Sequence, residues 1–177
     1  GGALCIGIGH CSTWLDGVSL SLADQIVSLG TAAGVTITTA ESCTGGLVAA
    51  ALTDAPGSSG IFDRGFVTYS NGAKIAMLEV RLATLSAFGA VSKEVAVEMA
   101  DGARRQANAD IAVSVTGIAG PGGSEHKPEG RVCFALAIRN QRTVAEQIDF
   151  GALGRREVRQ AATSHALKLI QAAIALV

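Results

Sequence analysis

The chain has 177 residues, of which 49% are hydrophobic and 16% are charged, and its formal net charge at pH 7 is −1. This length favours one domain with one core, and no apolar run approaches the roughly 18 residues that span a bilayer. A charge so close to zero gives no general field that would attract a nucleic acid. We therefore expect a soluble domain with neither a membrane nor a nucleic-acid partner.

Cysteine usage indicates a reducing compartment and no metal site. The chain has four cysteines: Cys5, Cys11, Cys43 and Cys133. They form neither a CxxC pair nor the paired His/Cys clusters that bind zinc. Cys5, His10 and Cys11 lie near one another, but they belong to residues 1–18, a lead-in without a clear period that we leave unassigned. With no secretory signature, we expect a cytoplasmic protein whose domain spans residues 19–177.

Helices and strands alternate over the first part of this domain. Apolar residues recur at helical spacing after Ser19 or Ser21, either of which can serve as the N-cap. β-branched residues then mark a short strand, and the "APG" sequence at 55–57 ends the helix that follows it. The elements predicted here are a helix over 19–33, a strand over 35–39, a helix over 45–54, a strand over 61–70 and a helix from about 71.

The second part of the domain contains a hairpin. Ser92 is the expected N-cap of a long amphipathic helix, and a loop with five glycines and two prolines precedes the last strands. The elements predicted here are a helix over 92–108, a strand over 111–117, the loop over 117–130, a hairpin of strands over 131–138 and 143–150, and a helix over 155–176. This order predicts a three-layer α/β/α sandwich with a mixed, mostly parallel β-sheet.

Three segments lie where a ligand site is expected. In open α/β sheets, ligands collect beyond the carboxyl ends of strands, where loops lead into helices. The segments "AESCTGG" at 40–46, "TYSNGAK" at 68–74 and "TGIAGPGG" at 116–123 all follow predicted strands. We expect them to share one pocket.

Two interpretations of Ser42 stay open on the residues alone. A serine at the start of a helix commonly caps it by accepting backbone N–H bonds. A nucleophilic serine would need an oxyanion site, which the N–H groups of Cys43, Thr44 and Gly45 can supply at a helix N-terminus. Gly45 and Gly46 would also let a substrate approach the backbone closely, although paired glycines occur in plain tight turns as well.

A base for Ser42 is easier to find among the lysines than among the histidines. The three histidines lie in the lead-in, in the loop over 117–130 and within the last helix, and the sequence around Ser42 lacks the GxSxG pattern of α/β-hydrolases. Of the four lysines, Lys74 alone lies at a strand-to-helix junction, where burial would lower its pKa and let it take a proton from serine. The alternative is a solvated surface lysine. Glu41 either orients the serine turn or offsets the charge of Lys74.

Further side chains complete the candidate site. Tyr69 and Thr116 carry hydroxyls that can relay a proton or orient a substrate, although either residue can equally be packing. Gly117 begins a loop with neither a P-loop nor a GxGxxG pattern, so its backbone can cradle an anion and nothing more specific follows. Arg155 and Arg156 open the last helix, where a phosphate can meet guanidinium groups and helix-end amides. We interpret Arg156 as a solvated arginine.

At these residues the sequence resembles a known family. The blocks are "TTAESCTGGLVAAALTDAPGSSGIFDRGFVTYSNGAK" at 38–74, "FGAVSKEVAVEMADGA" at 88–103, and "VSVTGIAGPGG" followed by "KPEGRV" at 113–132. They closely resemble the C-terminal domain of the CinA family, bacterial nicotinamide-nucleotide amidases, in the same order and at the same spacings from about Leu20 to the C-terminus. The resemblance implies a three-layer α/β/α fold.

The resemblance also implies an activity and a set of site residues. The activity is hydrolysis of the carboxamide of nicotinamide mononucleotide (NMN) to nicotinic acid mononucleotide and ammonia. Ser42 would be the nucleophile and Lys74 its base. Tyr69 and Thr116 would belong to the same site, and Arg155 would hold the substrate phosphate. Acyl transfer to serine needs no metal, so we expect no cofactor. The remaining assignments, all to substrate binding, are Glu41, Cys43, Thr44, Gly45, Gly46 and Gly117.

The sequence also leaves an alternative and shows two departures from the family. The alternative is a non-catalytic module that binds a nucleotide or a partner, as the family's association with competence and DNA-damage responses suggests. Exposed apolar helix faces in an Ala-rich chain favour a homodimer. Many relatives read Gly-Asp-Arg at the start of the last helix, where this chain has Leu153, Gly154 and Arg155 and lacks the Asp cap. The larger N-terminal domain of many CinA proteins has no match here, so we expect a stand-alone form or an excised domain.

Overall fold

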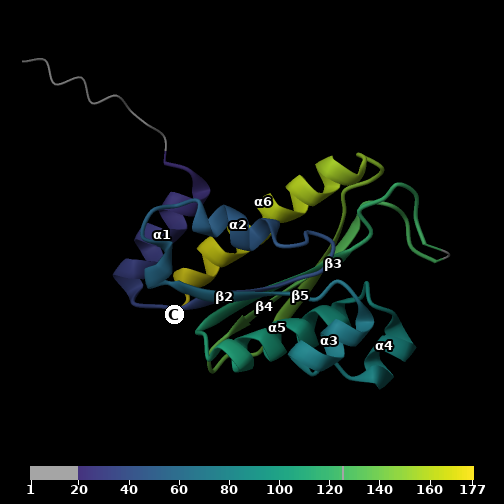
Figure 1. Ribbon diagram of the computed structural model, residues 1–177, viewed down its shortest axis with the longest axis horizontal. Helices are drawn as coiled ribbons and strands as arrows, with labels where there is room; N and C mark the ends of the chain where they lie inside the picture. The colour runs from purple at the N-terminus through teal and green to yellow at the C-terminus, as the bar shows by residue number, and fades with distance from the viewer. Residues whose placement is uncertain (1–19, 125) are drawn as a thin grey trace, which may run out of the picture.

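A mixed five-stranded sheet runs through the centre of the computed structural model, which describes residues 20–124 and 126–177. The strands are β1 (Ile37–Glu41), β2 (Phe62–Val67), β3 (Ile111–Gly117), β4 (Arg131–Ile138) and β5 (Val144–Asp149). They stand in the order β2-β1-β3-β4-β5 (Figure 1). β1 pairs in parallel with β2 and β3, whereas β4 pairs antiparallel with β3 and β5. The carboxyl ends of β1, β2 and β3 therefore meet at one edge of the sheet.

Helices cover both faces of the sheet, which confirms the predicted three-layer α/β/α sandwich. One face is covered by α1 (Leu22–Ala33), α2 (Leu47–Thr53) and α6 (Arg155–Ile174) (Figure 1). The other face is covered by α3 (Asn71–Leu78), α4 (Leu82–Phe88) and α5 (Lys93–Ala107) (Figure 1). The lead-in over residues 1–18, with its Cys5, His10 and Cys11 group, lies outside the described residues.

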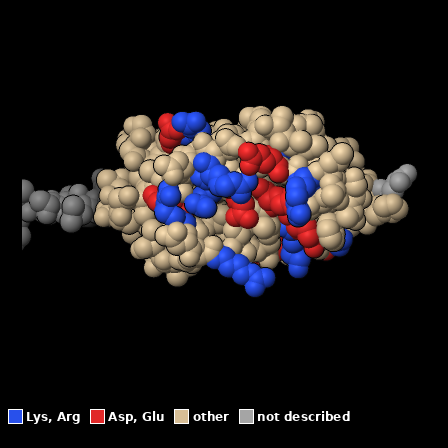
Figure 2. All heavy atoms as spheres, turned by 90° about the horizontal axis from the view of Figure 1, so that it is seen from below, with Lys and Arg blue, Asp and Glu red and all other residues tan. Residues whose placement is uncertain are grey.

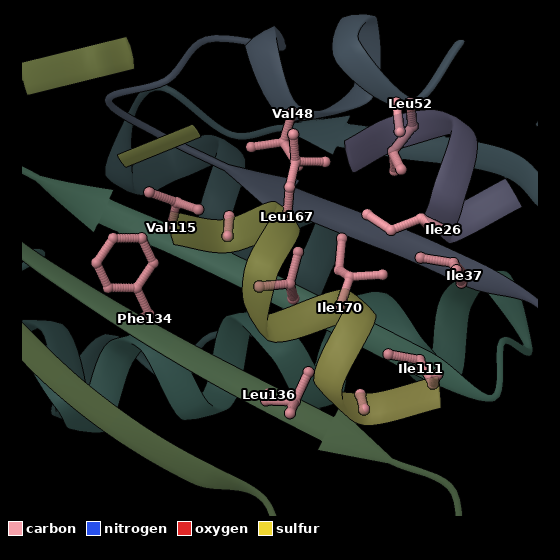
Figure 3. Close-up of a cluster of buried hydrophobic side chains, with 14 of the residues drawn as sticks. Ile26, Ile37, Val48, Leu52, Ile111, Val115, Phe134, Leu136, Leu167 and Ile170 are labelled. Carbon is pink, nitrogen blue, oxygen red and sulfur yellow. The ribbon is translucent and has the colours of Figure 1, made fainter. Parts of the chain in front are cut away.

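Large aliphatic side chains form the core between the sheet and the layer of α1, α2 and α6. β1 and β3 contribute Ile37, Ile111 and Val115, and Ile170 of α6 packs into the same cluster (Figure 3). Each of these four side chains is at most 1% exposed. Burying a side chain of this size stabilises a fold by about 1.5–3 kcal/mol, so this cluster accounts for much of the attachment of α6 to the sheet.

Smaller side chains form the core on the opposite face, where α3 and α5 are in close contact. A Cβ added to Gly102 of α5 would lie 2.0 Å from the carbonyl oxygen of Leu78 in α3, so a larger residue does not fit there. β3 is tied to α5 by the Ser114 hydroxyl, which donates to the Ala96 carbonyl oxygen at 2.6 Å. These contacts fix the position of α3, the helix that carries Lys74.

Local signals in the sequence mark several element boundaries. Ser21 caps α1 by accepting a hydrogen bond from the Asp24 N–H, and Ser92 caps α5 by accepting one from the Val95 N–H. β3 occupies its predicted range. β1 begins and ends two residues later than predicted because its pairing with both neighbours continues to Glu41.

Other elements also differ from the prediction. β2 ends at Val67, whereas its strand was expected to continue to residue 70. α2 begins at Leu47 rather than at 45, because Gly45 and Gly46 both have positive φ angles, +62° and +100°, which do not belong to a right-handed helix. α4 was not predicted from the sequence. This short helix has Arg81 as its N-cap, and the Arg81 side chain makes no capping hydrogen bond, so the usual signal of a helix start is missing.

Acidic and basic side chains alternate on the face that α3, α4 and α5 form (Figure 2). Arg81 Nη2 lies 2.5 Å from Glu98 Oε1, and Arg105 Nη2 lies 3.0 Å from Glu79 Oε2. This face is therefore not the uniform basic patch that commonly binds a nucleic acid. In the described part of the chain, no helix has the length and apolar character needed to cross a membrane.

Candidate active site

The carboxyl ends of three strands bring distant sequence segments together at one edge of the sheet. Ser42 follows β1, and its N–H donates to the Val115 carbonyl oxygen of β3 at 2.9 Å. Thr68 follows β2, and its N–H donates to the Glu41 carbonyl oxygen of β1 at 2.8 Å. The segments over 40–46 and 68–74 therefore meet beside Thr116, at the end of β3.

Ser42 and Lys74 are in contact at this edge, although they are 32 residues apart in the chain. The Nζ of Lys74 lies 3.0 Å from Ser42 Oγ and 2.8 Å from the Thr68 carbonyl oxygen. Ser70 fixes the start of α3 by accepting a hydrogen bond from the Ala73 N–H at 3.1 Å. This cap places Lys74 in the first turn of the helix, where its side chain is only 1% exposed.

The environment of Lys74 favours its neutral form. Burial lowers the pKa of the Lys74 ammonium below its ordinary value of 10.5, because the charged group loses hydration. The opposing influence is the negative charge that Cys43 would carry as a thiolate. Burial raises the pKa of the Cys43 thiol from 9.0 to about 12, so that thiol stays neutral near pH 7 and gives no such support. A neutral Lys74 has a lone pair that can accept the Ser42 proton.

Other side chains with the right chemistry are less suited to act as a nucleophile or a triad base. The protonated Cys43 thiol is a poor nucleophile, because the thiolate is the reactive form. His165 of α6 pairs with Glu146, with Nε2 2.5 Å from Oε1, and packs against the Phe134 ring. Among the described residues, no group of three or more His, Cys, Asp or Glu side chains is arranged to hold a metal ion.

Glu41, and not Ser42, caps α2. The N-cap of α2 is Gly46, which has no side chain to offer. The Glu41 carboxylate instead accepts hydrogen bonds from the N–H groups of Gly46 at 3.0 Å, Val48 at 3.1 Å and Ala49 at 2.8 Å. Glu41 is fully buried. The positive end of the α2 dipole is therefore paired with Glu41 and is not free to stabilise a substrate oxyanion.

These bonds change two of the sequence-based expectations for the serine turn. Glu41 was expected to contact the substrate. Its buried carboxylate instead accepts hydrogen bonds from the N–H groups at the start of α2 and so holds the turn. The Gly45 N–H donates to the Ser42 carbonyl oxygen at 3.0 Å, so it is unavailable as an oxyanion donor. Within residues 20–124 and 126–177, the N–H groups of Cys43 and Thr44 donate to no acceptor of another residue. The candidate oxyanion site is therefore these two amides.

Removal of the Glu41 carboxylate is expected to destabilise the whole fold. In Glu41→Ala, three helix-end amides lose a charged acceptor in a buried place, and we expect the free energy of unfolding to fall by about 3 kcal/mol. Glu94→Ala is the matched control, because Glu94 is an exposed acidic residue in the first turn of α5. Its effect should stay below about 1 kcal/mol. Urea unfolding of both variants measures the difference, and equal effects would show that Glu41 does not hold the turn.

Arg159 of α6 also holds this turn, and it was not among the site residues predicted from the sequence. Its Nε donates to the Cys43 carbonyl oxygen at 3.1 Å, and its Nη2 donates to the Thr44 carbonyl oxygen at 2.9 Å. Arg159 lies 116 residues beyond Cys43, so no local pattern in the sequence marks this contact. Only the packing of α6 beside the carboxyl end of β1 brings the two segments together.

Thr116 and Gly117 at the end of β3 mainly serve the fold. The Thr116 hydroxyl donates to the Ala90 carbonyl oxygen at 2.8 Å, which ties β3 to the segment before α5. In the described part of the chain, it makes no hydrogen bond with Ser42 or Lys74. A Cβ on Gly117 would lie 2.7 Å from Val132 Cγ2 of β4, so glycine is needed for strand packing at this position.

Tyr69 and Arg155 link the loops around the serine. Arg155 Nη2 donates to the Tyr69 hydroxyl at 2.6 Å, and Arg155 Nη1 donates to the Gly120 carbonyl oxygen at 2.9 Å. Both side chains are largely exposed, and Tyr69 is 59% exposed. At the start of α6, the N-cap is Gly154, and its N–H donates to Glu129 Oε1 at 3.2 Å. A carboxylate from the glycine-rich loop thus takes the place of the Asp cap that the sequence lacks.

The fold and the site define an α/β/α domain with a buried lysine facing a serine at the carboxyl edge of a mixed sheet. The model of the CinA C-terminal domain matches residues 19–174, so the chain belongs to this family. It is 51% identical over 156 residues to the nicotinamide-nucleotide amidohydrolase PncC of Escherichia coli, with 88% of this chain and 94% of that protein covered.

Solved structures agree with this assignment. The competence/damage inducible protein CihA from Agrobacterium tumefaciens is similar to this chain with a TM-score of 0.83 and 49% identity, covering 85% of this chain and 92% of that one. The competence damage-inducible protein A (ComA) from Klebsiella pneumoniae gives a TM-score of 0.83 and 39% identity, covering 87% of this chain and 95% of that one.

Proposed function

We propose that this chain is an amidohydrolase that cleaves the carboxamide of NMN to nicotinic acid mononucleotide and ammonia. The observation that carries the proposal is the 3.0 Å contact between Ser42 Oγ and the buried Nζ of Lys74. Its substrate class is supported by the 51% identity to a nicotinamide-nucleotide amidohydrolase over nearly the whole length of that protein.

In the first half of the proposed reaction, Ser42 becomes acylated. Neutral Lys74 donates one N–H to the Thr68 carbonyl oxygen and uses its lone pair to take the Ser42 proton. The Ser42 oxygen attacks the carboxamide carbon, and the amides of Cys43 and Thr44 donate to the oxyanion that forms. The Lys74 ammonium then protonates the departing nitrogen as the C–N bond breaks, which releases ammonia.

In the second half, water hydrolyses the ester on Ser42. Lys74 is neutral again after it has protonated ammonia, so it can take a proton from the attacking water. The tetrahedral intermediate collapses, the Ser42 oxygen leaves with the proton that Lys74 returns, and nicotinic acid mononucleotide departs. Each step of this scheme uses side-chain or backbone groups of this chain, the substrate and water.

We assign the substrate phosphate to Arg155. A guanidinium group has five N–H donors, and Arg155 uses two of its nitrogens for Tyr69 and Gly120, which leaves donors for a phosphate oxygen. Its exposed side chain lies beside Tyr69 of the segment that carries Lys74, which supports this role. Tyr69 would then orient Arg155 toward the substrate.

The pH dependence of turnover should follow the titration of Lys74. Below the lowered pKa of Lys74 the amine is protonated and cannot accept the serine proton, so kcat/KM should rise with pH as one proton is lost. The rise should be complete at a pH clearly below the ordinary lysine value of 10.5. Initial rates of ammonia release from NMN across the pH range measure this profile. A profile that is flat, or that rises only near 10.5, would contradict the role of Lys74.

Ammonia release from NMN by the purified protein tests the proposed function as a whole. We expect stoichiometric formation of ammonia and nicotinic acid mononucleotide. Tight binding of NMN without any ammonia would instead support a non-catalytic nucleotide-binding module.

We also propose that the chain forms a homodimer. Exposed apolar side chains lie on the neighbouring helices α3 and α4, among them Met77, Leu82 and Phe88. Light scattering after size-exclusion chromatography should give the mass of two chains, and the mass of one chain would contradict this proposal.

A further inference from the structure

The side chain of Arg159 makes a two-pronged contact with the backbone that follows Ser42. Nε and Nη2 donate to the carbonyl oxygens of two successive residues, Cys43 at 3.1 Å and Thr44 at 2.9 Å. The guanidinium also lies against Gly45, where an added Cβ would be 3.3 Å from Nη2. The helices that carry Arg159 and Lys74, α6 and α3, cover opposite faces of the sheet (Figure 1).

This contact fixes the direction of the neighbouring N–H groups. In a trans peptide the C=O and N–H bonds point to opposite sides. Among the described residues, the cis peptide bond is the one between Gly120 and Pro121, so the Cys43–Thr44 peptide is trans. A Cys43 carbonyl that points to Arg159 therefore directs the Thr44 N–H away from α6. The next peptide follows the same rule, because its carbonyl points to Arg159 and its N–H, on Gly45, donates to the Ser42 carbonyl oxygen at 3.0 Å.

The positive charge of Arg159 adds to this geometric effect. A hydrogen bond to a charged donor polarises the carbonyl that accepts it, and polarisation is passed along the peptide to its N–H. The Thr44 N–H is thus both aimed and strengthened as a donor. No acceptor binds it among the described residues, and Thr44 is fully buried, so this N–H is an unpaired donor shielded from bulk water.

We propose that Arg159 is a positioning residue of the amidase reaction, which holds the Cys43–Thr44 peptide so that the Thr44 N–H donates to the oxyanion. The proposal rests on the proposed function. According to the proposal, Arg159 stabilises the transition state. A purely structural contact between α6 and the turn after β1 would not have this effect. Loss of one oxyanion donor commonly costs about 100-fold to 1,000-fold in kcat.

The test compares Arg159→Ala with Arg156→Ala. Arg156 is an exposed arginine of the same helix that pairs with Glu157, so its replacement should leave the kinetics unchanged. For folded Arg159→Ala, we expect kcat for NMN to fall by about 100-fold with KM within about threefold of the wild type. Added ethylguanidinium should restore part of kcat in this variant and none in Ser42→Ala.

Arg159→Lys keeps the charge and can bind one of the two carbonyl oxygens, so its kcat should lie between those of the wild type and Arg159→Ala. This variant replaces Arg159→Ala in the test if Arg159→Ala does not fold. An unchanged kcat in either folded variant would overturn the proposal. The proposal would also be overturned if activity fell only in proportion to the amount of folded protein and ethylguanidinium did not restore it.

A second readout separates this proposal from the proposed function. If the wild type releases no ammonia from NMN, the proposed function fails on its own. The amide ¹⁵N chemical shift of Thr44 still reports whether the Cys43 carbonyl has a hydrogen-bond partner. A shift change at Thr44 in Arg159→Lys, absent in Arg156→Ala, supports the positioning of this peptide, and no change contradicts it.

Discussion

Ser42→Ala is expected to reduce the rate of ammonia release from NMN by a factor of about 1,000 or more, because it removes the atom that attacks the carboxamide. The fold should be retained. Glu41, rather than Ser42, caps α2, and the Ser42 N–H bond to Val115 belongs to the backbone. NMN should still bind to the variant, since the phosphate contact assigned to Arg155 is untouched.

Ser28→Ala is the control for this substitution. Ser28 is exposed in the middle of α1, so its replacement by alanine should change neither kcat nor the unfolding temperature appreciably. Steady-state kinetics and thermal unfolding of both variants give the comparison. If Ser42→Ala keeps full activity, Ser42 is not the nucleophile and the proposed mechanism is wrong.

Lys74→Met is expected to abolish activity and at the same time to stabilise the protein. The loss of the base should lower kcat by a factor of about 1,000. Burial makes the charged lysine unfavourable in the folded state, and methionine fills similar space without an ionisable group. The Thr68 carbonyl loses a donor, which offsets part of the gain. We expect a net increase of about 1 kcal/mol in the free energy of unfolding near pH 7.

The pH dependence of this stability difference has a definite sign. Because the folded pKa of Lys74 is lowered, the unfolded chain binds more protons than the folded one between the lowered value and 10.5. Wild-type stability should therefore rise with pH through this window, and the advantage of Lys74→Met should shrink. Lys168→Met, at an exposed position of α6, should show neither effect. An advantage of Lys74→Met over the wild type that grows with pH through this window would contradict the lowered pKa of Lys74.

The candidate site could be predicted in part because two of its residues sit at local junctions. Ser42 and Lys74 each follow a strand, and the parallel order of β1 and β2 brings such positions together. Hydroxyl groups at Ser21, Ser70 and Ser92 start helices as short-range capping rules require. These features depend on residues that are near one another in the chain, or on strand order alone.

The parts that could not be predicted depend on side-chain direction and on long-range packing. Glu41 has the same place in the chain whether it faces a substrate or the amides of α2, and only the path of the backbone through Gly45 and Gly46 decides between them. Thr116 ends β3 as expected, but its hydroxyl faces Ala90. Arg159 contacts the serine turn although it lies 116 residues beyond Cys43, with β2, β3, β4 and β5 between them in the sequence.

The most direct test of the central claim is an NMR titration of the lysine side chains with ¹³C at Cε. The chain has four lysines, and the Lys74 resonance is identified by its absence in Lys74→Met. We predict that Lys74 titrates at a pH clearly below the ordinary lysine value of 10.5, and with the same pKa as kcat/KM. Titration of Lys74 at the ordinary lysine value would show that it is charged at neutral pH and cannot activate Ser42.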